Sequence, residues 1–293
     1  MGSIISFAIV LLNSSTSILF AALGVLLMHL SGVMNIGAEG MMLIGAFSGV
    51  AGSAMTGNVW LGALFAMVMT GICGLIYAYC TVTMKANQVV VGISLNIFAD
   101  GITTTLYRMI FGMGSSSTKV DSFTKAGPLN VPVYVGILLV ILLSVFLYKT
   151  KAGLQVRGSG EYPLAIDSAG MSVNKIRYSS VIAGSMIIGL GGAYLSLGEL
   201  SFFTEGMVTG RGYIALAAVI FGRYTPLGTW LAVLVFVAGE VMVYRLQAAS
   251  IGIPTQLILM IPYLLTVIVV AVFGQKGGGP AALGIPFSKN QKQ

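Results

Sequence analysis

The residues best placed to do chemistry in this sequence are polar and charged side chains that interrupt long apolar runs. Asp100 lies midway along the run at 88–112, and Asn96 and Thr103 stand at helical spacing from it, so the three share one helix face. An ionised side chain is costly to place in lipid, and such residues usually mark a transport path or pair with other polar groups. Two interpretations therefore stay open for Asp100: the wall of a polar translocation path, or hydrogen bonds between helices.

Other polar residues within or beside apolar runs extend this predicted path. Asn13 and Ser14 belong to a polar patch inside the first run, and Asn35 stands immediately before the second. A lining role and helix packing are again both open for them. For Arg211 and Glu240, the remaining charges within runs, we favour a structural role such as an ion pair between helices.

Two glutamates mark the predicted beginnings of short helices. Glu39 and Glu205 each stand at the start of a glycine-rich apolar run. A carboxylate near a helix N-terminus interacts favourably with the helix dipole, by about 0.3–1 kcal/mol. We therefore expect each glutamate to stabilise the start of its helix.

Catalytic and metal-binding patterns are missing from the sequence. It contains no glycine-rich phosphate loop ending in Gly-Lys-Ser or Gly-Lys-Thr, and so no motif for ATP hydrolysis. The single histidine, His29, has no partner histidine for a metal site, and no Ser-His-Asp, Cys-His or paired intramembrane carboxylate pattern emerges. The sequence therefore predicts no catalytic residue, no metal and no cofactor, and it disfavours a membrane enzyme.

The polar stretch at 151–176 is the segment best suited to binding another protein. Glycines bracket a short part of it, and a proline lies near the beginning, which predicts a brief helix with proline in its first turn and glycine past its end. Two helical turns are too short for an enzyme domain but suit docking, and a plain connecting helix is the alternative. The predicted contact residues are Gly160, Glu161, Pro163, Ala165, Ala169 and Gly170.

The composition indicates which solvent surrounds the elements that hold these residues. Of 293 residues, 57% are hydrophobic and 8% are charged, whereas soluble domains carry about 25% charged residues. The apolar runs are long and nearly continuous, as at 135–147, which favours membrane-spanning helices over the alternating strands of a barrel. The sequence thus predicts an all-α integral membrane protein, with residues 1–293 forming a single transmembrane domain.

Runs long enough to cross a bilayer, about 17–25 residues each, predict about nine membrane spans. The second and seventh are weak, because they are rich in glycine and interrupted by polar residues. The predicted spans are 5–28, 36–56, 59–84, 88–112, 132–150, 177–197, 207–221, 226–247 and 256–274.

The basic residues predict how these spans are oriented. If 151–176 is cytoplasmic, four of the 15 Lys and Arg residues fall outside, Arg211 lies within a span, and the other ten fall inside. Because Lys and Arg gather in cytoplasmic loops, this places the N-terminus outside and the C-terminus inside. The same bias explains the net charge of +7 without nucleic acid, for which no basic stripe interleaved with aromatics is present.

A weak internal repeat agrees with this topology. Glu39-Gly40-Met41 recurs as Glu205-Gly206-Met207, and Leu61-Gly62 recurs as Leu227-Gly228, both with an offset of 166 positions. The offset superimposes the first four spans on the last four, which then run in opposite directions. This pattern is typical of the inverted repeats of many transporters.

Several stretches resemble the permease subunits of binding-protein-dependent ABC importers for nucleosides and simple sugars, in the branched-chain and ribose-type permease family. The matching stretches are Ser31-Gly-Val-Met-Asn35-Ile-Gly37-Ala-Glu39-Gly40-Met-Met, Gly153-Leu-Gln-Val-Arg157, Gly160-Glu161-Tyr-Pro163, Gly210-Arg211-Gly212-Tyr-Ile-Ala-Leu-Ala-Ala, Phe221-Gly222-Arg-Tyr-Thr-Pro226, Ile261-Pro262-Tyr263-Leu-Leu-Thr and Pro280-Ala-Ala-Leu-Gly284-Ile-Pro286. They run nearly end to end and are similar above all to the shorter of two paired permeases in nucleoside importers.

The resemblance implies a type II-like importer fold in a bacterial cytoplasmic membrane. It also implies three protein partners: a homologous second permease, a cytoplasmic ATPase with two nucleotide-binding domains in tandem, and a membrane-anchored binding lipoprotein. It makes 160–170 the coupling helix that docks on the ATPase. Larger members often have ten spans, so the nine predicted here depart from that number.

The expected function is passage of a nucleoside into the cytoplasm by alternating access, with ATP hydrolysed by the separate ATPase chain. One alternative is the same machine importing ribose or another simple sugar. A different class, a secondary transporter driven by an ion gradient, is compatible with the inverted repeat and Asp100. Such a transporter has no need of the glycine-bracketed segment at 158–170.

Overall fold

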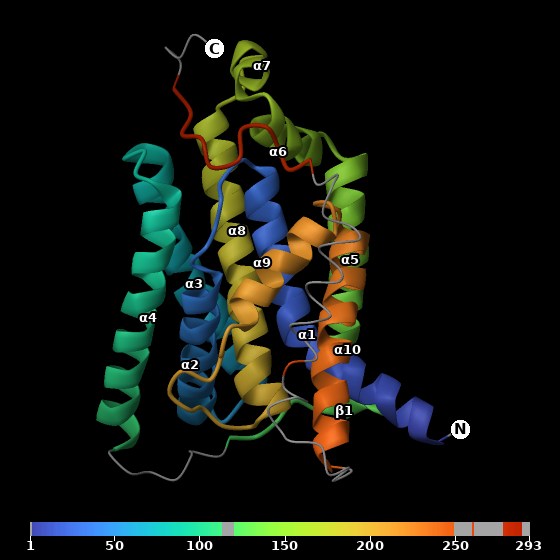
Figure 1. The fold of residues 1–293 in the computed structure, drawn as a ribbon. Helices are drawn as coiled ribbons and strands as arrows, with labels where there is room; N and C mark the ends of the chain where they lie inside the picture. Colours follow the sequence, from blue (N-terminus) through green and yellow to red (C-terminus); the bar gives the residue numbers. More distant parts are fainter. Residues whose placement is uncertain (1, 113–119, 249–259, 261–277, 289–293) are drawn as a thin grey trace.

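The apolar runs form a bundle of long helices in a computed structural model that describes residues 2–112, 120–248, 260 and 278–288 (Figure 1). The helices are α1 (Gly2–Leu30), α2 (Ala38–Thr56), α3 (Val59–Ala78), α4 (Gln88–Phe111), α5 (Val131–Lys149), α6 (Lys151–Glu161), α7 (Pro163–Ser168), α8 (Val173–Tyr194), α9 (Arg211–Phe221) and α10 (Pro226–Ala248). Single π-helical turns, Tyr79–Thr83 and Leu195–Glu199, extend α3 and α8, and a short antiparallel pair joins β1 (Lys125–Ala126) to β2 (Leu129–Asn130).

Local sequence signals set several helix boundaries. The Asn58 side chain accepts hydrogen bonds from the backbone N–H groups of Trp60 and Leu61, and Asn87 does the same for the start of α4. Such caps satisfy backbone donors that have no partner within the helix. Gly57 ends α2 in the left-handed conformation, with φ of 67°, which glycine adopts without strain.

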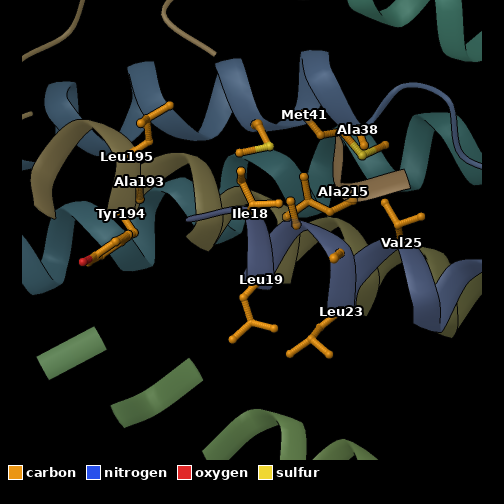
Figure 2. Packing of buried hydrophobic residues seen from close by; sticks show 14 of the residues in the cluster. Ile18, Leu19, Leu23, Val25, Ala38, Met41, Ala193, Tyr194, Leu195 and Ala215 are labelled. Atoms are coloured by element: carbon orange, nitrogen blue, oxygen red, sulfur yellow. The ribbon is translucent and has the colours of Figure 1, made fainter. Parts of the chain in front are cut away.

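The core lies where α8 packs against α1, α2 and α3. Glycines allow this close approach: a Cβ atom at Gly24 of α1 would overlap the carbonyl oxygen of Gly184, and one at Gly192 would overlap that of Met42. Figure 2 shows apolar side chains of α1, α2, α8 and α9 gathered at this core. The central helices are therefore held by backbone-to-backbone proximity as well as by apolar side chains.

The outer helices leave much apolar surface open. Only 17% of the membrane-length window of α4 is buried, against 72% for α8. Helix α4 packs mainly on α2, while α10 packs on α1, α9 and α5. Exposed side chains such as Ile97 (71%) and Leu231 (59%) must then meet lipid or another membrane protein.

Six helices in the described part of the chain are long and apolar enough to cross a membrane. They are Ile5–Leu30, Val59–Thr83, Gln88–Phe111, Val131–Lys149, Val173–Glu199 and Pro226–Gln247, and they match six of the predicted spans. The predicted second span is helix α2, which is not among these six, and the ninth lies outside the described residues apart from residue 260. An all-helical membrane protein is thus confirmed, whereas nine spans and an inverted repeat stay predictions.

Three features of the helix pattern differ from prediction. The predicted span at 207–221 begins only at Arg211, because Gly206 and Gly210 adopt positive φ and the backbone between them turns. Glu205 consequently lies in a loop and starts no helix. The polar stretch 151–176 holds an additional helix, α6, before the predicted short one, and also the first turn of α8, which begins at Val173 and not at 177.

Candidate functional site

The first candidate site lies where α4 meets the beginnings of α2 and α9. The side-chain oxygen of Asn96 accepts a hydrogen bond from the Gly40 N–H (2.8 Å). Its side-chain nitrogen donates to the Ile36 carbonyl (3.1 Å) and to the Tyr213 hydroxyl (2.9 Å). Asn96 is therefore fixed by three bonds and joins three segments of the chain.

Asp100 lies one turn beyond Asn96, on the exposed flank of α4. Its carboxylate has no hydrogen-bond or ion-pair partner among the residues that the structure describes. Thr104 and Arg108 continue the spacing of four, so Asn96, Asp100, Thr104 and Arg108 form a polar stripe along the helix. Thr103 instead is buried, and its hydroxyl donates to the Ala99 carbonyl (2.7 Å), so it faces away from the stripe.

At the end of the stripe, Arg108 forms an ion pair with Glu205 that was not predicted from the sequence. Arg108 donates through Nε and Nη2 to the two carboxylate oxygens of Glu205, at 2.7 and 2.8 Å. Both side chains are well exposed, and the hydrogen bonds from Arg108 lower the pKa of Glu205. The pair links α4 to the loop before α9 at the surface of the bundle.

Glu39 stabilises a helix other than its own. Its two carboxylate oxygens accept hydrogen bonds from the N–H groups of Gly210 (2.7 Å) and Gly212 (2.8 Å), at the start of α9. Glu39 also lies in the first turn of α2, where it was predicted, so its carboxylate stands at the starts of two helices. Beside it, Arg211 binds both carboxylate oxygens of Glu199 at 2.7 and 3.2 Å, and the side chains are only 12% and 18% exposed.

The remaining predicted path residues lie in separate places. Asn35 is fully buried and shapes the turn between α1 and α2, where its side-chain oxygen accepts from the Gly37 N–H (2.8 Å). Asn13 is partly buried and its side-chain oxygen accepts from the Asn130 N–H (3.2 Å). Ser14, next to it on α1, is also partly buried. The structure thus places Asn96 and Asp100 on one side of α4 and Thr103 on the buried side of the same helix, whereas Asn13 and Ser14 lie on α1. Asn35 is buried next to Ile36, whose carbonyl binds Asn96.

The second candidate site is α7, which stands at one end of the bundle (Figure 1). Pro163 occupies its first turn and is buried together with Ile166, so this face holds the helix to the rest of the chain. Ala165, in the helix, and Ala169, which caps its C-terminal end, are both exposed. Gly170, with φ of 79°, allows the chain to turn sharply after the helix.

The segment before α7 is held tightly. Gly160 is buried, and a Cβ atom there would overlap the Leu30 carbonyl oxygen at the end of α1. Glu161 is exposed, and its carboxylate accepts from the Ala281 N–H (3.3 Å). A cavity of about 160 Å³ separates α7 from the C-terminal residues. It is lined in part by Tyr162, Pro163, Leu164, Ile285, Pro286 and Phe287.

These features together define a class of protein. Six apolar helices of membrane length, a polar stripe on one of them and a short exposed helix at one end are typical of a polytopic membrane transport protein. Within the described ranges, no three His, Cys, Asp or Glu side chains gather where they could hold a metal.

The family follows from sequence comparison. The family model described as the branched-chain amino acid transport system / permease component matches residues 7–270. The chain therefore belongs to this family of permease components, and the resemblance seen in its motifs is confirmed. No solved structure matches the chain.

Curated relatives cover nearly all of the chain. A guanosine ABC transporter permease protein of Bacillus subtilis is 32% identical, over 94% of each chain. A nucleoside ABC transporter permease protein of Lactococcus lactis is 31% identical, over 94% of this chain and 95% of its own. A putative glucose ABC transporter permease protein of Haloferax volcanii is 33% identical, over 84% and 80%. A second guanosine ABC transporter permease protein of Bacillus subtilis also matches, at 23% identity over 83% and 75%.

Proposed function

We propose that this chain is the membrane-spanning permease subunit of an ABC importer that passes a nucleoside into the bacterial cytoplasm. The similarity along nearly the whole length to permeases named for guanosine and for nucleosides is the observation that carries the proposal. ATP would be hydrolysed by a separate chain, since this sequence has no phosphate loop. A binding protein outside the membrane would deliver the nucleoside, and two permeases would alternate between outward- and inward-open states.

The polar stripe on α4 is the proposed wall of the translocation path. An exposed carboxylate midway along a membrane-length helix is costly in lipid, so Asp100 needs water or a polar surface beside it. Tyr213 lies next to the stripe with 47% of its surface exposed, and Asn96 holds its hydroxyl. A second permease facing this flank would enclose a polar passage. The buried or partly buried candidates Asn13, Ser14, Asn35 and Thr103 would reach that passage only in a different conformation.

Replacing Asp100 with asparagine should slow nucleoside transport about tenfold while leaving the complex assembled. The side chain keeps its shape and loses its charge. A hydrogen bond that a passing substrate makes to a charged group contributes about 1.5–3 kcal/mol. Losing the lower part of that range corresponds to a tenfold change, because each 1.4 kcal/mol is a factor of ten. Initial uptake rates and the amount of purified complex measure the two effects. Asp121→Asn, an exposed carboxylate outside the helices, is the matched control. Wild-type uptake by Asp100→Asn would remove this residue from the path.

The exposed face of α7 is the proposed docking surface for the ATPase, with Gly160, Glu161, Pro163 and Gly170 fixing the helix in place.

The presence of two guanosine permease proteins in Bacillus subtilis that both match this chain supports a second, homologous permease as partner. We also propose an extracytoplasmic lipoprotein as the binding protein and a multi-pass location in the cytoplasmic membrane, with the N-terminus outside and the C-terminus inside.

This orientation predicts labelling from opposite sides. Ser122, between α4 and α5, and Ser168, in α7, are both exposed and suit the same change to cysteine. With Cys73 and Cys80 replaced by alanine, Ser122→Cys should react with an impermeant thiol reagent in intact cells, and Ser168→Cys only after lysis. Reaction of both variants in intact cells, or the reverse pattern, would contradict the proposed topology.

A sugar is the second candidate substrate, because two relatives are named for glucose. Competition separates the two classes: unlabelled guanosine should abolish uptake of a labelled nucleoside, and a hundredfold larger amount of glucose or ribose should leave it unchanged. The opposite result would assign the importer to sugars.

A further inference from the structure

The C-terminal residues 280–286 return to the end of the bundle that carries α7 (Figure 1). The Ala282 N–H donates to the Gly160 carbonyl (2.8 Å), immediately before α7. The Gly284 N–H donates to the Gly32 carbonyl (3.1 Å), immediately after α1. We name residues 280–286 the C-terminal strap, because two backbone hydrogen bonds tie it to segments far away in the sequence.

Arg177, near the start of α8, completes the attachment. Its side chain is almost fully buried, with 1% of the residue exposed. One guanidinium nitrogen donates to the Ile285 carbonyl (2.9 Å), and the other donates to the Ser159 carbonyl (3.4 Å). The Ser159 hydroxyl in turn donates to the Ser31 carbonyl (2.9 Å). One buried cation therefore joins the strap, α6 and the end of α1 to α8.

The fit around Arg177 requires glycine. Gly32 has φ of 91°, and a Cβ atom there would lie 2.8 Å from the Arg177 guanidinium. Gly160 packs against the end of α1 with no room for a side chain. The two Nη atoms of Arg177 have carbonyl partners, whereas its buried Nε has none among the described residues, so the two carbonyl bonds are the polar contacts that fix this arrangement.

The position of these bonds suits the transmission of motion. They hold the chain at Ser159 and Gly160, just before α7, whereas Ala165 and Ala169 on the outer face of α7 stay exposed. If a docked partner displaces the exposed residues of α7, the displacement is transmitted to the helices that are bonded to the segment before α7. Here the segment before α7, Ser159 and Gly160, is bonded to α1 and α8, which pack on each other in the core.

We propose that the C-terminal strap and Arg177 fasten α6 and α7 to α1 and α8, so that movement of the ATPase reaches the core helices. Arg177 is thus a positioning residue for coupling, and it acts through the strap without touching substrate or nucleotide. This inference rests on the proposed importer function. A strap that has to detach during the cycle is the competing possibility.

Arg177→Met tests the fastening in the complete complex, reconstituted with its ATPase, second permease and binding protein. Loss of the two donors should reduce the ATPase stimulation produced by the loaded binding protein about tenfold. Basal ATP hydrolysis should stay unchanged, and more ATP should be used per nucleoside imported. Arg177→Lys keeps the charge and one donor direction and should recover part of the stimulation. Stimulation at the wild-type level in Arg177→Met would overturn the proposal.

A covalent bridge provides the second test and does not depend on the stability of the Arg177 variant. Tyr162 and Ile285 line the same cavity between α7 and the C-terminal residues, and both are about half exposed. In a background with Cys73 and Cys80 changed to alanine, a short bismaleimide would join Tyr162→Cys to Ile285→Cys. The bridge should leave uptake intact in the presence of Arg177, and it should restore stimulation in Arg177→Met.

Loss of uptake on bridging in the presence of Arg177 would show that the strap must detach, and would overturn the proposal. Stimulation of the wild-type complex by loaded binding protein is the control for the proposed function itself. If the wild type shows no stimulation, the importer assignment fails. If the wild type is stimulated and the variants match it, only the fastening role fails.

Discussion

Arg211→Met should destabilise the chain by about 3–5 kcal/mol, the typical loss when one partner of a buried ion pair is removed. Arg211 and Glu199 face each other with two hydrogen bonds and little exposure, so methionine would leave the Glu199 carboxylate charged and without its partner. Glu240 also interacts with Arg211 electrostatically and would lose a compensating charge. Unfolding of the detergent-solubilised chain, followed by heat or denaturant, measures the loss.

Two comparisons separate the ion pair from a general effect of the substitution. Arg108→Met removes an equally short pair that is exposed, and it should change stability much less. The double variant Arg211→Met with Glu199→Leu should recover most of the loss, because no unpaired charge is left at position 199. If Arg211→Met is as stable as Arg108→Met, the buried pair does not hold α9 in place.

Ala165→Glu should produce a permease that inserts normally and fails to couple to the ATPase. Ala165 is exposed on α7, so the fold tolerates glutamate there, whereas a docked partner would bury an unpaired charge at a cost of several kcal/mol. Because each 1.4 kcal/mol is a factor of ten, co-purified ATPase or its stimulated hydrolysis should fall at least about tenfold.

The matched control is Ala152→Glu in the first turn of α6. Ala152 is also exposed, and an acidic residue there suits the helix N-terminus. This variant should retain both the ATPase and uptake. Uptake and ATPase co-purification at wild-type levels in Ala165→Glu would make α7 a plain connector, which was the alternative left open by the sequence.

Helices with strong apolar runs were predictable, and so was the weaker run that forms α2 (Ala38–Thr56), whereas the start of α9 and the whole of α6 were not. The six membrane-length helices are continuous apolar runs, so their existence follows from composition and length alone. The start of α9 depends on positive-φ glycines at 206 and 210, which a hydropathy pattern does not detect. Helix α6 was missed because its sequence, Lys151–Glu161, is polar and contains three glycines, and tertiary contacts at Gly153 and Gly160 decide its conformation.

The candidate sites divide in the same way. The brief helix with proline in its first turn follows from local sequence signals, and the structure places it at Pro163–Ser168; docking through Ala165 and Ala169 stays a prediction. Which side of α4 is covered depends on α2 and α9, so the sequence did not separate exposed Asp100 from buried Thr103. The sequence indicated only that Arg177 is one of the cytoplasmic basic residues. Its partners are the backbone carbonyls of Ser159 and Ile285, and a backbone carbonyl cannot be recognised from residue type.

ATP dependence of nucleoside uptake is the most direct test of the importer assignment. Proteoliposomes would contain this chain with its ATPase, second permease and loaded binding protein, under an imposed ion gradient. Labelled guanosine should accumulate when ATP is supplied to the ATPase side and should stop when ATP is replaced by a non-hydrolysable analogue, with the gradient unchanged. Uptake that continues without ATP hydrolysis and collapses with the gradient would instead identify a secondary transporter and contradict the account.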